Sequence, residues 1–164
     1  MDMANITLSP AEPRDFEDYY AIRCGKSDVF WMGYEKPPVR DAMERLFMGR
    51  LGTSRLEQPG DKRIYMIQAD EKNVGFIQFS LGEEGLEFGY SVLDGQRGKG
   101  YGSAGMKQAV VLAKEYETCC FAHIRDDNIA SITAMTRAGL KPTDDAVMKY
   151  FPQSGLVGYR KYIL

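Results

Sequence analysis

The sequence predicts an α/β protein with a mixed, mostly antiparallel sheet and helices on both of its faces. Residues 63–68 and 73–80 alternate between apolar and polar side chains, and the short connection between them is typical of an antiparallel hairpin. Residues 86–93 form another apolar run, which leads through a helical segment at residues 104–116 to a strand at residues 118–124. This order predicts a parallel pair of strands, because a crossover of this length returns the chain in the same direction.

The N-terminal third is expected to be helical after a short strand at residues 6–8. A helix is predicted over residues 13–25, since it begins with a proline, which suits the first turn, and ends with a glycine. Residues 27–38 are expected to form a loop, because the segment ends on two prolines that cannot lie inside a helix. A second helix is predicted over residues 39–51, followed by a polar linker at residues 52–61.

The C-terminal part supplies another helix and the last strands. Asp127 or Asn128 is expected to cap this helix, and Gly139 is expected to end it. Strands are predicted at residues 150–151 and 157–162. At this length, residues 1–164 are interpreted as one domain with a sizeable core.

The composition is that of an ordinary soluble globular protein, with 44% hydrophobic and 27% charged residues. A formal net charge of -2 lacks the basic excess that nucleic-acid-binding proteins show, so no nucleic acid is expected as a partner. The apolar runs are too short for a membrane span, and the first residues lack the basic region of a signal peptide. A cytoplasmic protein without membrane association is therefore expected.

The three cysteines, Cys24, Cys119 and Cys120, are odd in number and lack the spacing of a zinc site. Reduced thiols in the cytoplasm and no bound metal are therefore expected. Cys119 and Cys120 are adjacent on a predicted strand, so their side chains should face different environments.

The stretch at residues 96–105, QRGKGYGSAG, connects a predicted strand to a predicted helix and has the features of a phosphate-binding loop. Glycine permits positive φ and a close approach of the backbone to a ligand. The first amides of the helix have no internal partner, and Arg97 and Lys99 add positive charge. The alternative is a flexible surface turn, and neither the P-loop pattern nor the Rossmann pattern matches.

The run at residues 97–102 has the form R-x-x-G-x-G, which resembles the acetyl-CoA pyrophosphate loop of the GNAT family of N-acetyltransferases. A second segment, at residues 128–140, is similar to that family's N-x-x-[SA]-x(7)-G-[FL] pattern at the family spacing. Its serine, Ser131, resembles the RimJ/RimL-like branch. The resemblance covers residues 70–140, and two motifs in the right order are much more specific than either alone.

The resemblance implies a sheet whose parallel strands splay into a V that admits the pantetheine arm of acetyl-CoA. It also implies direct transfer of an acetyl group from acetyl-CoA to a primary amine, by a monomer or a homodimer. The acceptor stays open between an amino sugar, a protein N-terminus, a polyamine and an antibiotic. The residues expected to bind the cofactor are Val92, Leu93, Arg97, Gly98, Lys99, Gly100, Tyr101, Gly102, Ser103, Asn128 and Ser131.

Asn128 has a plainer alternative, and so does Arg137. Asn128 can bind a pantetheine amide or simply cap a helix, and Arg137 can reach a cofactor phosphate or only neutralise a helix C-terminus. The backbone amides near Val92 and Leu93 are expected, from the resemblance, to polarise the thioester carbonyl.

Glu87 is the candidate general base. It shares one face of the strand at residues 86–93 with Gly89 and Ser91, and this small face can accept a ligand. Its position matches the strand on which many GNAT enzymes keep a base glutamate. The alternative is a solvated surface glutamate. His123, the only histidine, is expected to be a core residue.

Ser131 is the candidate general acid. Many GNAT members carry a tyrosine seven residues after the motif asparagine, but this chain has Met135 there, which cannot donate a proton. Ser131 has a capping or packing role as its alternative, and Tyr150 is a further candidate acid. Because the tyrosine is missing, a non-catalytic acetyl-CoA-binding regulatory module is the alternative function.

The segment around Trp31 and Tyr34 is unusually aromatic for an expected loop. These side chains would be costly to leave in water, so they either cover the core or line a substrate site. Together with Glu87, Trp31 and Tyr34 are the predicted substrate residues.

Overall fold

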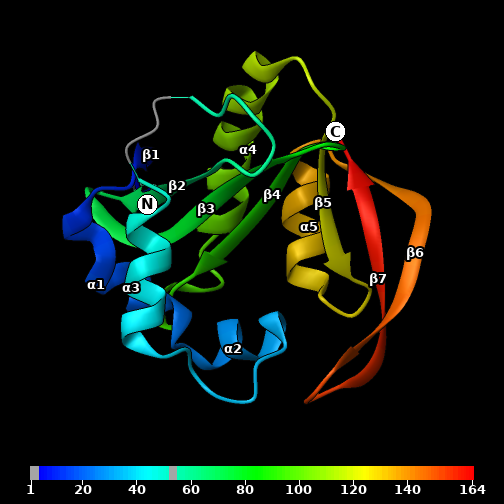
Figure 1. Cartoon of the computed structure of the whole chain (residues 1–164), viewed down its shortest axis with the longest axis horizontal. Coiled ribbons are helices and arrows are strands. Elements are labelled where there is room, and N and C mark those ends of the chain that lie inside the picture. The colour runs from blue at the N-terminus through cyan, green and yellow to red at the C-terminus, as the bar shows by residue number, and fades with distance from the viewer. Residues whose placement is uncertain (1–3, 52–54) are drawn as a thin grey trace.

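A computed structural model describes residues 4–51 and 55–164. Within these residues a sheet of seven strands has the order β1-β2-β3-β4-β5-β7-β6 (Figure 1). The strands are β1 (Ile6–Pro10), β2 (Lys62–Ala69), β3 (Lys72–Gly82), β4 (Gly85–Val92), β5 (Cys120–Arg125), β6 (Lys141–Phe151) and β7 (Gly155–Ile163). Only β4 and β5 run parallel, and the other neighbouring strands are antiparallel. The predicted mixed, mostly antiparallel sheet is confirmed.

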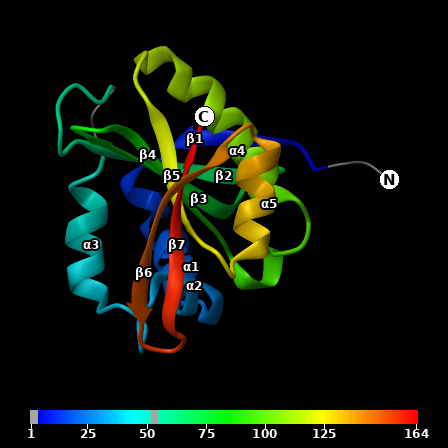
Figure 2. The ribbon, with the colours of Figure 1, turned by 90° about the vertical axis from the view of Figure 1, so that its right-hand side faces the viewer.

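Helices pack on both faces of the sheet, as predicted, and each face has its own apolar cluster. Figure 2 shows α3 on one side and α4 and α5 on the other. The alternation of β2 divides the clusters, since Met66 packs under α1 and α3 whereas Ile67 packs under α4. The helices are α1 (Phe16–Arg23), α2 (Lys26–Met32), α3 (Arg40–Met48), α4 (Tyr101–Ala113) and α5 (Ile129–Arg137), with short 3-10 turns at Pro13–Asp15, Asp94–Gln96 and Lys114–Tyr116. None of the helices in the described part of the chain is long and apolar enough to cross a membrane.

The parallel strands β4 and β5 separate soon after they meet. They pair only at Leu86 with Cys120 and at Glu87 with Phe121, although β4 continues to Val92 and β5 to Arg125. Figure 1 shows the two strands diverging toward α2. The V between parallel strands that the family resemblance implies is therefore present.

Residues 26–32 form α2, where the sequence analysis expected a loop over residues 27–38. Gly33, with φ of 79°, ends this helix in the left-handed conformation that glycine adopts without strain. The two prolines lie beyond this end, so they do not prevent a helix before it. Burial of Asp28 and Val29 fixes α2 against the rest of the molecule.

Two other segments differ from the sequence predictions. Of the expected polar linker at residues 52–61, positions 52–54 lie outside the described residues, but Leu56 is only 2% exposed and belongs to the core under α4. The strand β6 is much longer than predicted, because a register shift between Pro142 and Ala146 accommodates the proline within an edge strand. The prediction that Cys119 and Cys120 face different environments is confirmed, since Cys119 is exposed and Cys120 is buried.

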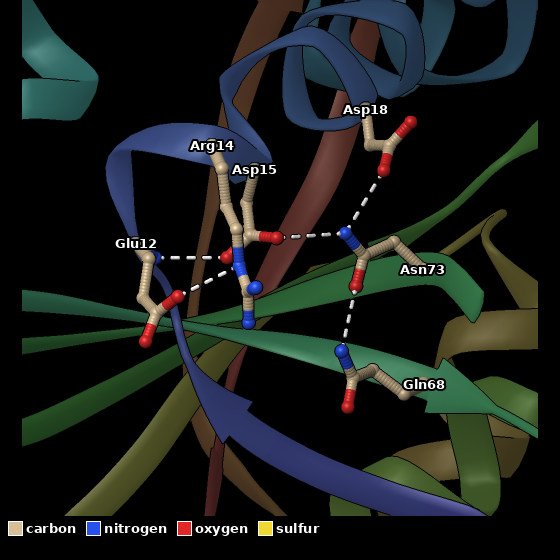
Figure 3. A network of polar contacts seen from close by, with 6 residues as sticks. All are labelled: Glu12, Arg14, Asp15, Asp18, Gln68 and Asn73. Atoms are coloured by element: carbon tan, nitrogen blue, oxygen red, sulfur yellow. Dashed lines mark hydrogen bonds and ion pairs between the residues drawn. The ribbon is translucent and has the colours of Figure 1, made fainter. Parts of the chain in front are cut away.

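A polar network fixes α1 against the hairpin of β2 and β3 (Figure 3). The Asn73 amide donates to Asp15 Oδ1 at 3.0 Å and to Asp18 Oδ2 at 2.9 Å. Its oxygen accepts a hydrogen bond from the Gln68 amide at 3.1 Å, and the other Asp15 oxygen accepts from the Glu12 N–H at 2.8 Å. The network positions α1, and the chain turns from there directly into α2 beside the open end of the V.

Candidate functional site

The glycine-rich loop lines a cavity of about 310 Å³ between α4 and α5, here called the loop cavity. Gly98 and Gly100 have φ of 80° and 81°. Nothing in the described chain lies within 4 Å of a Cβ built on either glycine. The backbone of the loop therefore borders open space, which suits the close approach of a ligand.

The N-terminus of α4 presents amide donors beside the loop. The first bond of α4 is donated by Ala104 N–H to Gly100 C=O at 3.0 Å, so the amides of residues 101–103 precede the helical ladder. Arg97 and Arg137 line the same cavity with positive charge, and Arg97 also pairs with Asp94 at 3.3 Å. Amides at a helix N-terminus together with two guanidinium groups favour an anion such as a phosphate.

The other predicted cofactor residues do not all line the loop cavity. Val92, together with Tyr101 and Ser103, lines the loop cavity. Leu93 does not line it, because its amide donates to Val74 C=O at 2.8 Å and its side chain packs under α1. Lys99 is exposed and donates to Gln96 Oε1 at 3.0 Å, outside the cavity lining.

Gly102 is required for the packing of α4 on β4, which the sequence did not reveal. A Cβ at this position would lie 2.7 Å from Cε2 of Tyr90. The absence of a side chain at Gly102 therefore lets α4 pack onto the Tyr90 ring of β4. A substitution of Gly102 would move Tyr90 as well as alter the loop, so Gly100 is the cleaner position for testing ligand binding.

A second cavity of about 310 Å³, here called the gap cavity, opens where β4 and β5 separate. Glu87 and His123 lie on its wall, with Nδ1 of His123 3.0 Å from Oε1 of Glu87. Their side chains are 40% and 27% exposed, so a ligand can reach both. The expectation that His123 is a core residue is wrong. The pairing of β5 with β4 ends at Phe121, so His123, the next residue on the same face of β5, borders the gap.

Aromatic side chains complete the wall of the gap cavity. The His123 ring stacks on Tyr159 with centroids 5.3 Å apart. Burial raises the pKa of Tyr159, and the nearby Glu87 charge raises it further, so this phenol stays protonated at neutral pH. Trp31 also lines the cavity, and its ring lies 4.9 Å from the guanidinium of the buried Arg125. Trp31 therefore lies at the candidate site, whereas Tyr34 lines a neighbouring cavity.

Tyr90 lies at the boundary between the loop cavity and the gap cavity and lines both. Burial raises the pKa of Tyr90, while a hydrogen bond with the Ser131 side chain opposes this shift. Sequence reasoning did not include Tyr90 among the candidate site residues. The available signal was a tyrosine among apolar residues on the strand before the glycine-rich loop.

Asn128 and its neighbours link the two cavities. The Asn128 side chain caps α5 by accepting the Ser131 N–H at 3.2 Å, and both residues line the gap cavity. Met135 is 2% exposed and lines the same cavity from within the core. Tyr150, in contrast, is 66% exposed on β6 and lines neither cavity, so the structure does not support it as the acid.

The glycine loop leaves room for an anion, and a carboxylate and an imidazole are reachable in the adjacent gap. This arrangement suits an enzyme that uses a phosphate-bearing cofactor. Residues 5–141 match the family model described as acetyltransferase (GNAT) domain, and the chain belongs to this family. It is therefore an N-acetyltransferase, and acetyl-CoA is the acetyl donor.

Solved structures share this fold at low sequence identity. A spermidine N-acetyltransferase from Vibrio cholerae, in complex with CoA and spermine, is 14% identical with a TM-score of 0.81, covering 97% of this chain and 94% of that one. An N-acetyltransferase from Staphylococcus aureus Mu50 is 20% identical with a TM-score of 0.75, covering 98% of each chain. A GNAT-family acetyltransferase from Bacillus anthracis is 16% identical with a TM-score of 0.76, covering 100% of this chain and 96% of that one. No curated protein sequence matches the chain significantly.

Among the described residues no group of three histidine, cysteine, aspartate or glutamate side chains is placed to hold a metal ion.

Proposed function

We propose that the protein acetylates a primary amine held in the gap cavity, with Glu87 and His123 removing the proton. The observation that carries this proposal is the 3.0 Å contact between Glu87 and His123 at the point where β4 and β5 separate. A module that only binds acetyl-CoA would not need a carboxylate and an imidazole exposed in the gap. The form of the motif around Ser131 supports assignment to the RimJ/RimL-like branch.

The loop cavity fits the phosphates of acetyl-CoA. The open space beside Gly98 and Gly100 supports a close approach of the pyrophosphate to the backbone. The amides of residues 101–103 and the guanidinium groups of Arg97 and Arg137 would hold it. Acetyl-CoA, when bound, supplies the activated acetyl thioester.

An alkyl ammonium must lose a proton before its nitrogen can attack a thioester. Two arrangements of the pair achieve this. In the first, the Glu87 carboxylate accepts the proton while His123 Nδ1–H donates to that carboxylate and holds it in place. In the second, Nε2 of His123 accepts the proton and Glu87 stabilises the imidazolium that forms. Tyr159 fixes the plane of the imidazole in both cases.

Tyr90 and Ser131 are proposed to hold the proton that the departing thiolate needs. Both side chains line the gap cavity, and burial raises the pKa of the Tyr90 phenol, which keeps it protonated at neutral pH. A thiolate needs less help to leave than an amine, since the ordinary pKa of a thiol is about 8.5. Tyr90 on β4 thereby replaces the tyrosine whose usual position, Met135, is on α5.

The experiment compares Glu87→Gln and His123→Asn with wild type in kcat/KM, measured by mass spectrometry of the acetylated amine across pH. General bases typically contribute about 10²–10⁴-fold in rate, so Glu87→Gln should lose that much while the Kd of acetyl-CoA stays the same. If His123 is the proton acceptor, His123→Asn should lose as much in kcat/KM as Glu87→Gln does.

Glu84→Gln is the matched control for Glu87→Gln. Its side chain is 73% exposed at the turn before β4, where it lies 3.7 Å from Lys161. This variant should keep wild-type kcat/KM. A Glu87→Gln protein that also keeps near wild-type kcat/KM at every pH would contradict the proposed base.

We also propose a cytoplasmic location and a monomeric or homodimeric state, without a nucleic-acid or membrane partner. The three free thiols support a reducing compartment. Size-exclusion chromatography with light scattering tests the oligomeric state, and a species larger than a dimer would contradict it.

A further inference from the structure

A third cavity, of about 280 Å³, adjoins the gap cavity and is here called the basic cavity. The two share four lining residues, Met32, Gln78, Gly89 and Tyr90. Arg50 and Lys62 line the basic cavity away from the gap. A molecule that reaches Glu87 in the gap cavity can therefore extend toward these two cations without leaving the protein surface.

The carboxylates that line the two cavities already have partners. Glu87 contacts His123 at 3.0 Å. Asp28 lies 3.2 Å from Arg23, and both side chains are almost fully buried. Arg125, the remaining cation of the gap cavity, forms an ion pair with Asp127 at 2.8 Å. These three pairs leave no free carboxylate for Arg50 or Lys62 among the described residues that line the two cavities.

Neither Arg50 nor Lys62 is paired with a carboxylate of the basic cavity, where Asp28 pairs with Arg23 instead. The Arg50 guanidinium donates to the side-chain oxygen of Gln78. Lys62 forms no ion pair with any residue in the described ranges 4–51 and 55–164. The preceding residue, Asp61, does not line this cavity, and one of its carboxylate oxygens accepts two backbone N–H groups of the preceding turn at 2.9 and 3.1 Å. Arg50 and Lys62 therefore bring two cations without a carboxylate partner to the basic cavity, while Asp61 lines a neighbouring cavity with both of them.

The strand register places these charges in line with the proposed base. Lys62 on β2 is directly opposite Ser80 on β3, and Ser80 is directly opposite Glu87 on β4. Opposed residues project from the same face of a sheet, and neighbouring strands lie about 4.8 Å apart. The Cα atoms of Lys62 and Glu87 are therefore on the order of 10 Å apart across two strand spacings. Gln78 connects Arg50 to this row by donating to Ser80 Oγ at 3.1 Å.

We infer that the acceptor is a small amine that also carries a carboxylate or phosphate group. This inference rests on the proposed acetyl transfer. The amine lies at Glu87 and His123, and the anionic group lies at Lys62 and Arg50, which supply charge-assisted hydrogen bonds. A diamine of the same length would place a second ammonium beside two cations, where like charges repel it.

The test uses three acceptors that differ only at the end remote from the amine. These are δ-aminovalerate with a carboxylate, ω-aminopentanol with a hydroxyl, and cadaverine with a second ammonium. The expected order of kcat/KM is aminovalerate, aminopentanol, cadaverine, with at least a tenfold step between the first two. Raising the salt concentration should reduce this step, because the anion site is partly exposed and ions screen it.

Lys62→Gln, alone and combined with Arg50→Gln, tests the assignment to these side chains. Both variants should lose the preference for aminovalerate while kcat/KM for the neutral aminopentanol stays within about twofold of wild type, roughly 0.4 kcal/mol. The single variant guards against a folding effect of replacing the half-buried Arg50. Lys107→Gln is the matched control, since Lys107 is exposed on α4 and lines none of the three cavities.

Equal kcat/KM for the three acceptors, faster turnover of cadaverine, or a preference that survives in the double variant would each overturn the inference. Acetyl transfer would still stand after any of these results. If the protein binds acetyl-CoA in calorimetry but acetylates none of the three, the anionic-acceptor assignment is also wrong. A protein that does not bind acetyl-CoA at all would instead refute the proposed function.

Discussion

Replacing Gly100 with alanine should separate the conformational role of the glycine loop from its role in binding. Gly100 has φ of 81°, and nothing in the described chain lies within 4 Å of a Cβ built on it. The Gly100→Ala protein should therefore fold, with the left-handed conformation costing about 1–2 kcal/mol. For a chain of this size that loss lowers the Tm by about 2–8 °C, since each kcal/mol shifts it by roughly 2–4 °C.

The same substitution should weaken acetyl-CoA binding at least tenfold, about 1.4 kcal/mol. Gly100 caps α4 just before the amides of residues 101–103, and the new methyl group would project into the open space of the loop cavity. Hydrogen bonds to a charged group are worth about 1.5–3 kcal/mol each, so losing one of these amides to the phosphate accounts for the expected change.

Gly155→Ala is the matched control for backbone strain. Gly155 has φ of 73°, also has open space around a built Cβ, and lies in the hairpin between β6 and β7. It should lose a similar amount of stability without losing affinity for acetyl-CoA. Calorimetry and thermal unfolding measure both effects. An unchanged Kd for Gly100→Ala, or an equal loss for Gly155→Ala, would refute the assignment of the loop to the phosphates.

Three further predictions concern the leaving group, pH and the core. Ser131→Ala and Tyr90→Phe should each lower kcat with little change in the Kd of acetyl-CoA, and a folded double variant with full turnover would exclude both hydroxyls as the acid. Hydrogen bonds from Arg125 hold the pKa of Asp127 below its ordinary value. The ion pair therefore stabilises the fold fully at pH values above the ordinary carboxyl pKa. This stabilisation is lost as the pH falls through the lowered pKa of Asp127. Asp127→Asn should therefore reduce the Tm at neutral pH but not near pH ~2, and an equal reduction at both pH values would contradict this account. Leu56→Ala should cost about 2–5 kcal/mol in chemical unfolding because this side chain is almost fully buried, and a loss below about 1 kcal/mol would show that the segment is peripheral.

Several features of the candidate site follow from short stretches of sequence. The period of two in β4 places Glu87 on the face opposite Tyr90, and the structure has this arrangement. The glycine pattern before α4 predicts positive φ, which Gly98 and Gly100 adopt. These predictions succeed because side-chain alternation and the conformational freedom of glycine are properties of a few consecutive residues.

Errors arose where a local rule was applied too far along the chain. The two prolines exclude a helix at their own positions but not in residues 26–32, where Gly33 supplies an earlier end. The strand predicted at residues 150–151 begins at Lys141 instead, because an edge strand with a register shift tolerates Pro142. In both segments, packing against the rest of the molecule outweighed the local signal.

The sequence by itself determined the α/β class, the positive φ of the loop glycines Gly98 and Gly100, and the face on which Glu87 lies. Only the tertiary structure decided that His123 contacts Glu87, that Tyr90 and Ser131 line one cavity, and that Lys62 lies in line with Glu87. Each of these pairs joins residues on different elements, and their distances depend on strand register and on the point where β4 and β5 separate. That point is set by how the helices pack on the two faces of the whole sheet, which no short stretch of sequence encodes.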